Sequence, residues 1–349
     1  MKKIKVAVIF GGKSPEYEVS IHSASSALEN MPEHFDIELY GITEVGDWYL
    51  YQGDIESINN NTWHTGNISK ATLSVNQADH GFFVFTDEGI ELRKVDVIFP
   101  ILHGANGEDG TVQAVCELAG IPCCGSDMIS SAMSMDKEYT HIVCERADVP
   151  MAKWMIVRKT NEIDFEVEYK KADEIVGIPC VLKPANAGSS FGVGKADDME
   201  SFKEALIEAF KYDKKVIVEE FIKGFEVGCS VLEGDELILG EVDEIEIVAD
   251  IFDYFEKYNQ ITTKIHVPAR VSQQINDEVK RLSEIVFTSL GCSGLSRIDF
   301  FVRDEVVYLN EINTIPGFTS QSRYPSMLKY VGYDYTKTIE TIVNTALNK

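Results

Sequence analysis

The first third of the chain alternates continuous apolar runs with amphipathic stretches. Residues 4–10 and 95–102 are uninterrupted apolar runs of the kind that parallel sheets bury on both faces, and residues 36–42 give a further strand signal. After the first run, apolar side chains recur at helical spacing over residues 19–31. Residues 46–94 are polar and rich in glycine and asparagine, and we expect a β excursion there. The pattern predicts a βαβ-type domain.

The rest of the chain predicts two more units, which gives an α/β (α+β) fold in three domains. The second unit is expected to hold strands at residues 153–157, 179–183 and 216–221, a polar helix after the first strand and a helix at 199–210. The third is expected to hold strands at residues 227–233, 237–244, 294–303 and 306–313, a helix at 277–290 and a closing helix. We place the domains at residues 1–136, 137–223 and 224–349.

Composition and charge limit which kinds of molecule the protein can bind and where it is expected to be found. With 44% hydrophobic residues, the chain of 349 residues can bury several cores. Its formal net charge of -25 opposes binding to nucleic acid or to an anionic membrane, although a local cluster of Lys and Arg could still bind a small anion. The seven cysteines include no C-x-x-C pair and are expected to be reduced thiols. The first apolar run is too short for a signal peptide or a membrane span, so we expect a cytoplasmic protein.

The most informative segments are Arg297-Ile298-Asp299 and Glu311-Ile312-Asn313, which two strands and a tight turn would bring together. With the turn at residues 303–305, Asp299 is expected close to opposite Glu311, and Asn313 shares their face because alternate side chains of a strand point the same way. Two carboxylates and an amide oxygen are ligands for a hard cation, most simply magnesium. An exposed acidic hairpin in an acidic protein is the alternative interpretation.

A second group of residues has the features of a nucleotide site. Lys183 ends an apolar strand, and the small-residue loop at 187–194 could fold over phosphates and donate backbone N–H groups. Glu219 ends another apolar strand, where it could accept from an adenine amino group while Phe221 or Ile222 covers the ring. Alternatively, the loop is an ordinary flexible hairpin and Glu219 is only the end of a core strand.

One tempting pattern does not fit its usual role. Residues 7–14 read AVIFGGKS and satisfy a permissive Walker A pattern, but the variable positions 8–10 belong to the apolar strand. Acidic residues follow where a phosphate needs positive potential. We therefore expect no P-loop, and Glu16, in a strand-to-helix loop, suits an ammonium group better. His103 follows a buried strand, where the sites of α/β proteins gather, and is a further candidate.

Several segments, in order along almost the whole chain, resemble the ATP-grasp carboxylate–amine ligases and most closely the D-alanine–D-alanine ligase family. They read GGKSPEYEVS (11–20), HGANGEDGT (103–111), SMDK (134–137), KP (183–184) with GSS (188–190), EKY (256–258), RID (297–299) and EINTIPGFTS (311–320). The resemblance implies an N-terminal domain for the first D-amino acid and two ATP-grasp domains that sandwich ATP.

The resemblance also implies roles for single residues at the nucleotide. The ATP-binding residues would be Lys137, Lys183 and Lys257 at the phosphates, Glu219, Phe221 and Ile222 around the adenine, and Glu226 at the ribose. Magnesium, as two ions that manganese can replace, would bind Asp299, Glu311 and Asn313 and neutralise charge during phosphoryl transfer.

At the first substrate, Glu16 would bind the ammonium of D-alanine, and Val19 and His103 would line its site. Ser189 and Tyr258 would form a hydrogen-bonded set with Glu16. The D-alanine carboxylate would attack the γ-phosphate to give an acyl phosphate, and the amine of the second amino acid would then attack that carbonyl. Arg297 and the Gly317 N–H would stabilise the tetrahedral oxyanion.

Fewer residues bear on the identity of the second substrate. Ser322 would bind its carboxylate. Arg323 follows where D-alanine-specific members usually carry Leu or Met, and Phe252 stands where several relatives have Tyr. These departures resemble the D-alanine–D-serine ligases of glycopeptide (vancomycin) resistance, of the VanG type, and Tyr258 favours an amine over a hydroxy acid.

The expected partners are D-alanine, D-serine and ATP, in a homodimer that serves peptidoglycan synthesis. Three alternatives stay open. The protein could be a housekeeping D-alanine–D-alanine ligase, Arg323 could point to solvent, or the chain could be a nucleotide-binding regulator without catalysis.

Overall fold

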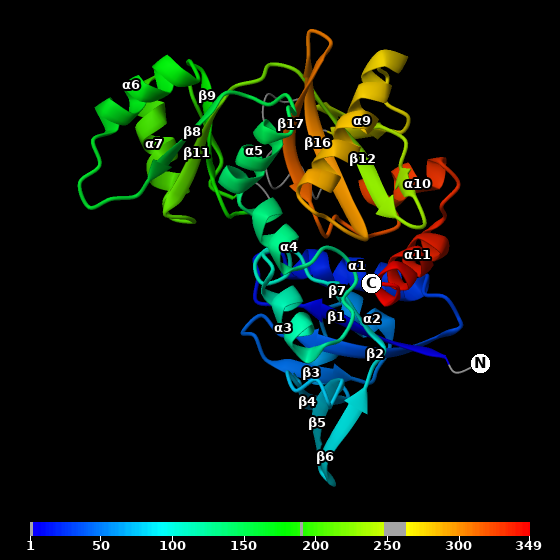
Figure 1. Ribbon diagram of the computed structural model, residues 1–349. Coiled ribbons are helices and arrows are strands. Elements are labelled where there is room, and N and C mark those ends of the chain that lie inside the picture. Colours follow the sequence, from blue (N-terminus) through cyan, green and yellow to red (C-terminus); the bar gives the residue numbers. More distant parts are fainter. Residues whose placement is uncertain (1–2, 189–190, 248–262) are drawn as a thin grey trace.

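Three β-sheets organise the computed structural model, which describes residues 3–188, 191–247 and 263–349 (Figure 1). The first sheet has the strand order β6-β5-β4-β3-β2-β1-β7, in which β1 runs parallel to β2 and to β7. Its strands are β1 (Ile4–Gly11), β2 (Phe35–Ile42), β3 (Trp48–Tyr51), β4 (Ile68–Leu73), β5 (Gly81–Thr86), β6 (Gly89–Lys94) and β7 (Val97–Ile101). Its helices are α1 (Tyr17–Glu29), α2 (Ile55–Asn59), the 3-10 turn η1 (Trp63–Thr65) and α3 (Thr111–Ala119).

The expected parallel βαβ core and the β excursion are both confirmed by this sheet. β1 contains the residues that excluded a P-loop, and β3 to β6 extend the sheet as antiparallel strands. Within the excursion, the short helix α2 was not predicted. Asp54 caps it by accepting from the Ser57 N–H at 2.7 Å, and the fully buried Trp63 follows, so a few local contacts stabilise a single turn.

Two helices connect the first sheet to the second. They are α4 (Met128–Met135) and α5 (Lys137–Arg146), and Asp136 between them caps α5 by accepting from the Glu138 N–H. The second sheet is antiparallel in the order β10-β9-β11-β8. It consists of β8 (Trp154–Arg158), β9 (Cys180–Pro184), β10 (Gly194–Ala196) and β11 (Lys215–Glu220), with the helices α6 (Phe165–Ile175) and α7 (Met199–Ala209) packed on it through a core of their own.

The third sheet is also antiparallel and has the order β15-β14-β12-β16-β17, with β13 paired to β12. It consists of β12 (Phe225–Glu233), β13 (Leu237–Leu239), β14 (Asp243–Ile247), β15 (Thr263–His266), β16 (Leu295–Arg303) and β17 (Val306–Asn313). Its helices are α9 (Gln273–Ser289), α10 (Arg323–Tyr330) and α11 (Tyr335–Leu347).

One predicted strand is wrong: residues 237–244 form two strands. The break falls at Gly240, whose N–H donates to the Ser230 carbonyl at 2.8 Å. A Cβ at Gly240 would lie 3.0 Å from the Cβ of Met327, so this backbone passes directly under α10. The close approach of the helix, which the local sequence does not encode, ends β13 and redirects the chain into β14.

The C-terminal helix returns to the N-terminal sheet. Ile339, Ile342 and Val343 of α11 belong to the same buried cluster as Val6 and Val8 of β1. Figure 1 shows α11 beside the first sheet, and it also contacts β12 of the third sheet, where Thr345 Oγ1 donates to the Glu233 carbonyl at 2.7 Å. The ends of the chain thus share one core. Among the described residues, no helix has both the length and the apolar character needed to cross a bilayer.

Candidate functional site

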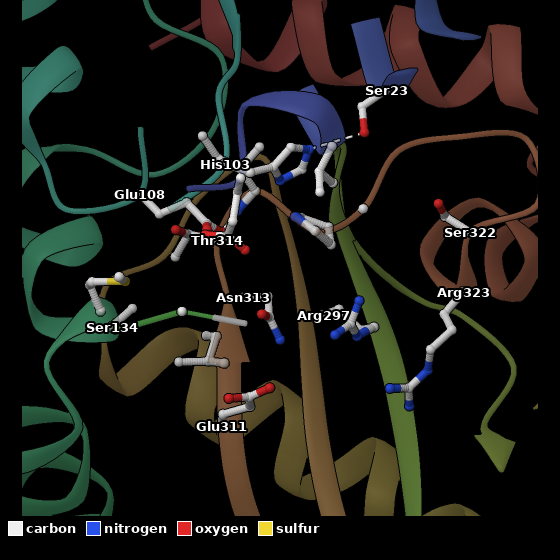
Figure 2. A pocket seen from close by; sticks show the side chains of 18 of the residues that line it. Ser23, His103, Glu108, Ser134, Arg297, Glu311, Asn313, Thr314, Ser322 and Arg323 are labelled. Atoms are coloured by element: carbon white, nitrogen blue, oxygen red, sulfur yellow. Dashed lines mark hydrogen bonds between the residues drawn. The ribbon is translucent and has the colours of Figure 1, made fainter. Parts of the chain in front are cut away.

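A cavity of about 840 Å³ lies where loops and strands of all three sheets meet (Figure 2). It brings together predicted residues that are widely separated in the sequence. Those that line it are Glu16, Val19, His103, Lys137, Glu226, Arg297, Glu311, Asn313, Gly317, Ser322 and Arg323. Other predicted residues within the described ranges lie outside this lining, namely Lys183, Glu219, Phe221, Ile222 and Asp299. Ser189, Phe252, Lys257 and Tyr258 lie outside the described residues.

Glu16 begins α1 and is enclosed by two glycine backbones. It is 7% exposed. Gly104, in the loop after β7, has a φ of +69°, and a Cβ there would lie only 2.0 Å from Glu16 Oε2. A Cβ at Gly188 would lie 2.8 Å from the same oxygen. Only residues without a side chain allow the carboxylate this position, so the two glycines shape this end of the cavity.

Glu108 is a second, partly buried carboxyl group near Glu16. Its Oε2 accepts from the Gly104 N–H at 2.9 Å, and its Oε1 accepts from the Ile315 N–H at 3.0 Å. Burial, with the neighbouring Glu16 carboxylate, raises the pKa of Glu108 to about 8, although the two N–H donors and Arg297 oppose that rise. Glu108 therefore connects the loop after β7 to the segment after β17.

His103 is held as a neutral ring in the same wall. Its Nε2 lies 3.0 Å from Ser23 Oγ, which also accepts from the Phe318 N–H at 3.3 Å, as Figure 2 shows for the His103 contact. Burial and, to a smaller extent, the nearby Arg297 cation lower the pKa of His103 to about 4, although a hydrogen bond with the backbone of Ile315 opposes them. A neutral imidazole can donate or accept one hydrogen bond toward a ligand without adding charge.

The predicted hairpin of β16 and β17 is confirmed. Asp299 pairs with Glu311 in register, and Asn313 Nδ2 donates to Asp299 Oδ2 at 3.1 Å. The turn uses Asp304 and Glu305, both with positive φ, as a two-residue hairpin requires. Asp299 is 1% exposed, so the alternative of a merely exposed acidic hairpin is wrong.

These three side chains fit a hard cation by their chemistry. Each side chain has an oxygen atom that can coordinate a metal ion, and Glu311 and Asn313 line the cavity. Among the residues that the structure describes, no three His, Cys, Asp or Glu side chains cluster as a metal site would. The predicted set therefore depends on the amide oxygen of Asn313 as its third donor.

Two arginines neutralise Asp299 from different directions. Arg297, on the same strand, donates to both oxygens of Asp299 at 2.7–3.1 Å. Arg323, from the start of α10, reaches Asp299 Oδ1 with Nη2 at 3.1 Å. Burial of one carboxylate between two guanidinium groups is favourable because every charge has a hydrogen-bonded partner.

The guanidinium of Arg323 lies across three adjacent strands. Its Nε and Nη2 donate to both oxygens of Asp243 on β14 at 2.7 and 2.8 Å, and its Nη1 donates to Glu226 Oε1 on β12 at 2.8 Å. Gly228 of β12 lies between Asp243 and Asp299 in register, and a Cβ there would be 2.4 Å from Arg323 Nη2. The missing side chain at Gly228 provides the space for the guanidinium.

This placement decides one open alternative. The side chain of Arg323 is only 10% exposed, so it does not point to solvent. Figure 2 shows it running from the start of α10 alongside β12, away from Ser322. Glu226, expected at a ribose, is an ion-pair partner of Arg323 in this arrangement.

Ser322 and Gly317 form the end of the cavity next to α10. Ser322 is the N-cap residue of that helix, its Oγ accepts from the Thr319 N–H at 3.0 Å, and a Cβ at Gly317 would lie 3.4 Å from this Oγ. A hydroxyl and a helix N-terminus are suited to a carboxylate.

The nucleotide candidates lie around β9, β11 and α5. Lys183 Nζ contacts Glu219 Oε2 at 2.6 Å and donates to Asn310 Oδ1 at 3.1 Å, while Lys137 Nζ donates to the Ala187 carbonyl at 2.9 Å. Burial of Glu219 raises its pKa, but the Lys183 cation and the hydrogen-bonded contact with His141 outweigh burial and hold that pKa well below the usual range. Phe221 lies under Lys195 Nζ, 4.8 Å from the ring centroid, and Ile222 is buried.

Three residues of this region escaped the sequence reasoning. Glu108 stood within a quoted segment but was given no role. His141 follows Lys137 by four residues, a spacing that places both on one face of a helix and could have identified it. Asp243 gave no signal, because its partner Arg323 is 80 residues away.

Comparisons with known proteins agree with the geometry. Family models described as "D-ala D-ala ligase N-terminus" and "D-ala D-ala ligase C-terminus" match residues 5–126 and 143–344. A D-alanine–D-alanine ligase of Acetivibrio thermocellus is 41% identical over 99% of this chain and 96% of its own length. The vancomycin C-type resistance protein VanC2 of Enterococcus casseliflavus is 39% identical over 97% of both chains.

Solved structures are similar over the whole chain. The VanG D-Ala:D-Ser ligase of Enterococcus faecalis superposes with a TM-score of 0.90 at 43% identity and covers 99% of both chains. A D-alanine–D-alanine ligase of Bacillus anthracis complexed with ATP superposes with a TM-score of 0.72 at 26% identity, over 99% of this chain and 98% of its own.

Proposed function

The chain belongs to the D-alanine–D-alanine ligase family, and we propose that within it this protein is an ATP-dependent D-alanine–D-serine ligase. One observation carries the choice of acceptor: the buried guanidinium of Arg323, held by three carboxylates at the wall of the cavity. The similarity to VanG and VanC proteins supports the same choice. The product would serve peptidoglycan precursors with altered termini and thereby vancomycin resistance.

The proposed reaction has two steps. A carboxylate oxygen of D-alanine attacks the γ-phosphorus of ATP, ADP leaves, and D-alanyl phosphate forms. The amine of D-serine then attacks the carbonyl carbon, phosphate leaves with the electrons of the C–O bond, and the amine loses a proton. Glu16 binds the ammonium of the first substrate, next to Val19 and His103. Arg297 and the Gly317 N–H stabilise the oxyanion of the second step.

Several cations support the proposed binding of ATP in an acidic chain. Lys137 lines the cavity and Lys183 lies behind its wall, where both can reach phosphates. Glu219 and Glu226, with Phe221 and Ile222, would contact the adenosine, and Glu226 would exchange its contact with Arg323 for the ribose. Asp299, Glu311 and Asn313 would hold magnesium, which neutralises phosphate charge when bound.

The acceptor argument depends on the one N–H of Arg323 Nη1 that the three carboxylates leave over, because Nε, Nη2 and the other N–H of Nη1 contact Asp243, Asp299 and Glu226. Ser322 and the backbone at the start of α10 would bind the carboxylate of the second substrate. Arg323 makes the adjoining wall polar, where a methyl-binding wall would be apolar. A hydroxyl satisfies polar groups there that a methyl group leaves unpaired, and such sites discriminate strongly against the substrate that lacks the hydroxyl.

A competition experiment tests the choice of acceptor. The enzyme receives ATP, magnesium, D-alanine and D-serine, with the two amino acids at equal concentration, and the dipeptides are separated by mass spectrometry. We expect mainly D-alanyl-D-serine. Mainly D-alanyl-D-alanine would assign the protein to the housekeeping reaction instead, and ATP binding without ADP release would indicate a regulator.

Two variants then ask whether Arg323 is the cause. Arg323→Leu should shift the kcat/KM ratio toward D-alanine by about tenfold or more. It also removes the Arg323 cation from Asp243, so Gly228→Ala is the companion variant: its methyl group would lie 2.4 Å from Arg323 Nη2 and 2.7 Å from Asp299 Oδ1, and it displaces the guanidinium while the chain keeps every charge. A shift of the ratio in both variants supports the proposal. An unchanged ratio in both would assign selectivity to other residues.

A further inference from the structure

His141 lies between two hydrogen-bond acceptors. Its Nδ1 is 2.7 Å from the backbone carbonyl oxygen of Lys137, and its Nε2 is 2.9 Å from Glu219 Oε1. A carbonyl oxygen and a carboxylate oxygen can only accept. Either neutral tautomer of the ring would therefore place a nitrogen lone pair against an oxygen lone pair. Both contacts are satisfied only when both ring nitrogens carry a proton.

The surroundings of His141 enforce these contacts. Its side chain is 2% exposed, and its ring packs edge-to-face against Trp154 with centroids 5.4 Å apart. Glu219 is 7% exposed and uses its second oxygen to bind Lys183 at 2.6 Å. Because the Lys183 ammonium is the strongest of the influences that hold the pKa of Glu219 low against the effect of burial, the carboxylate stays ionised and cannot donate to His141 itself.

The charge of His141 changes what Lys183 can do. With a neutral ring, the negative charge of Glu219 would cancel the positive charge of Lys183 at 2.6 Å. With a cationic ring, Glu219 is already neutralised and Lys183 contributes net positive charge. This positive charge acts strongly because water screens charges weakly at a buried site. It also offsets locally the formal net charge of -25 that the whole chain carries.

We propose that His141 is a positioning residue of the nucleotide site, a doubly protonated ring that neutralises Glu219 and leaves the charge of Lys183 for the phosphates of ATP. Through its contact with the Lys137 carbonyl it also fixes the first turn of α5, which carries Lys137. This inference rests on the proposed role of Lys137 and Lys183 in binding ATP.

The protonation state is tested on the ligand-free protein. Long-range ¹H–¹⁵N NMR correlations distinguish a ring with two N–H groups from either neutral tautomer. Of the signals of the seven histidines, the one missing in His141→Gln is that of His141. We expect the pattern of two protonated nitrogens near pH 7.5. A neutral tautomer would overturn the proposal, whatever reaction the enzyme catalyses.

The role of the charge is tested by equilibrium binding of ATP to three variants. His141→Gln keeps a polar side chain without charge and should weaken ATP binding about tenfold, which corresponds to ~1.4 kcal/mol. His141→Lys restores the positive charge and should recover most of the affinity. Glu145→Gln, on the exposed side of α5, is the matched control for a charge change on this helix and should bind as the wild type does.

The outcomes separate this inference from the proposed function. Unchanged ATP affinity in His141→Gln would overturn the positioning role, and so would equal loss in His141→Lys and His141→Gln. Wild-type protein that binds ATP but makes no D-alanyl-D-serine would contradict the proposed acceptor and leave the role of His141 supported. The KM for D-alanine should stay constant in His141→Gln. A merely structural defect would raise both the dissociation constant of ATP and the KM for D-alanine.

Discussion

Glu108 is a partly buried and Glu219 a buried carboxyl group beside the cavity, and their surroundings shift their pKa values in opposite directions. Glu108, in the loop after β7, accepts from two backbone N–H groups and lies near another carboxylate, Glu16. Glu219, on β11, lies between the Lys183 cation and the His141 ring. The pKa of Glu108 is raised to about 8, whereas that of Glu219 is held well below its ordinary value.

The difference shows that burial alone does not set the charge of a site. Burial raises the pKa of both groups, and the nearest charges then decide the result. At the end of the cavity around Glu16, the raised pKa lets Glu108 keep its proton at neutral pH. At the end around Glu219, this carboxylate stays ionised beside the Lys183 ammonium. The first is suited to an ammonium group and the second to an anion such as a polyphosphate.

The largest effect is expected from removing a cation beside Glu219. Lys183→Met leaves this buried carboxylate with only His141 and should lower the free energy of unfolding by about 3–5 kcal/mol, because a buried charge loses a partner. Urea unfolding near neutral pH measures the change.

The control for this variant is an exposed ion pair. Lys171 contacts Glu168 at 2.7 Å on α6 and is half exposed, so Lys171→Met should change the free energy of unfolding by about 0.5 kcal/mol or less. An equal loss of unfolding free energy in the two lysine variants would show that Lys183 stabilises the fold no more than an exposed ion pair does.

The next largest effect is expected at the other end of the cavity. Gly104→Ala places a Cβ 2.0 Å from Glu16 Oε2 at a φ of +69°, and should cost about 2–3 kcal/mol of stability. It should also raise the KM for the first D-alanine, since Glu16 must move. Urea unfolding and initial rates at saturating ATP measure the two effects.

Gly332→Ala separates backbone strain from the clash. Gly332 has a φ of +88° with nothing within 4 Å of the added Cβ, so only strain remains, at about 1 kcal/mol. A KM for D-alanine that changes equally in both glycine variants would argue against the close packing of Glu16.

The last effect concerns the proton on Glu108 and is spread over the pH scale, so it is small at any one pH step. A carboxyl group whose folded pKa is raised stabilises the fold fully below its ordinary pKa of 4.5, and this contribution is lost as the pH rises toward about 8. The stability of the wild type relative to Glu108→Gln should therefore fall as the pH rises from about 5.5 to about 7.5, by at most about 1.4 kcal/mol per pH unit.

Urea unfolding of both proteins across this range measures the slope. Glu117→Gln is the control, because the exposed Glu117 also accepts from a backbone N–H, that of Met128, at 3.0 Å. A stability difference between the wild type and Glu108→Gln that stays constant with pH would contradict a retained proton on Glu108.

Local patterns predicted most of the elements and the hairpin of β16 and β17. Alternation of side chains and a tight turn were enough to pair Asp299 with Glu311, since both are fixed within one hairpin. The helix that begins at Thr111 and the glycine that ends it, Gly120 with a φ of +66°, follow equally from local preferences. The break at Gly240 did not, because a distant helix causes it.

The sequence by itself determined the family, the order of strands and helices, and the residue types of the site, because these are written in contiguous segments and short periods. Tertiary structure alone decided which partners those residues have. Glu108 meets Ile315 across 207 residues, and Arg323 meets Asp243 across 80. Such contacts depend on how three sheets pack together, and the charge of each group depends on those contacts. The protonation of Glu108, Glu219 and His141 is therefore a property of the fold, which no segment of the chain carries alone.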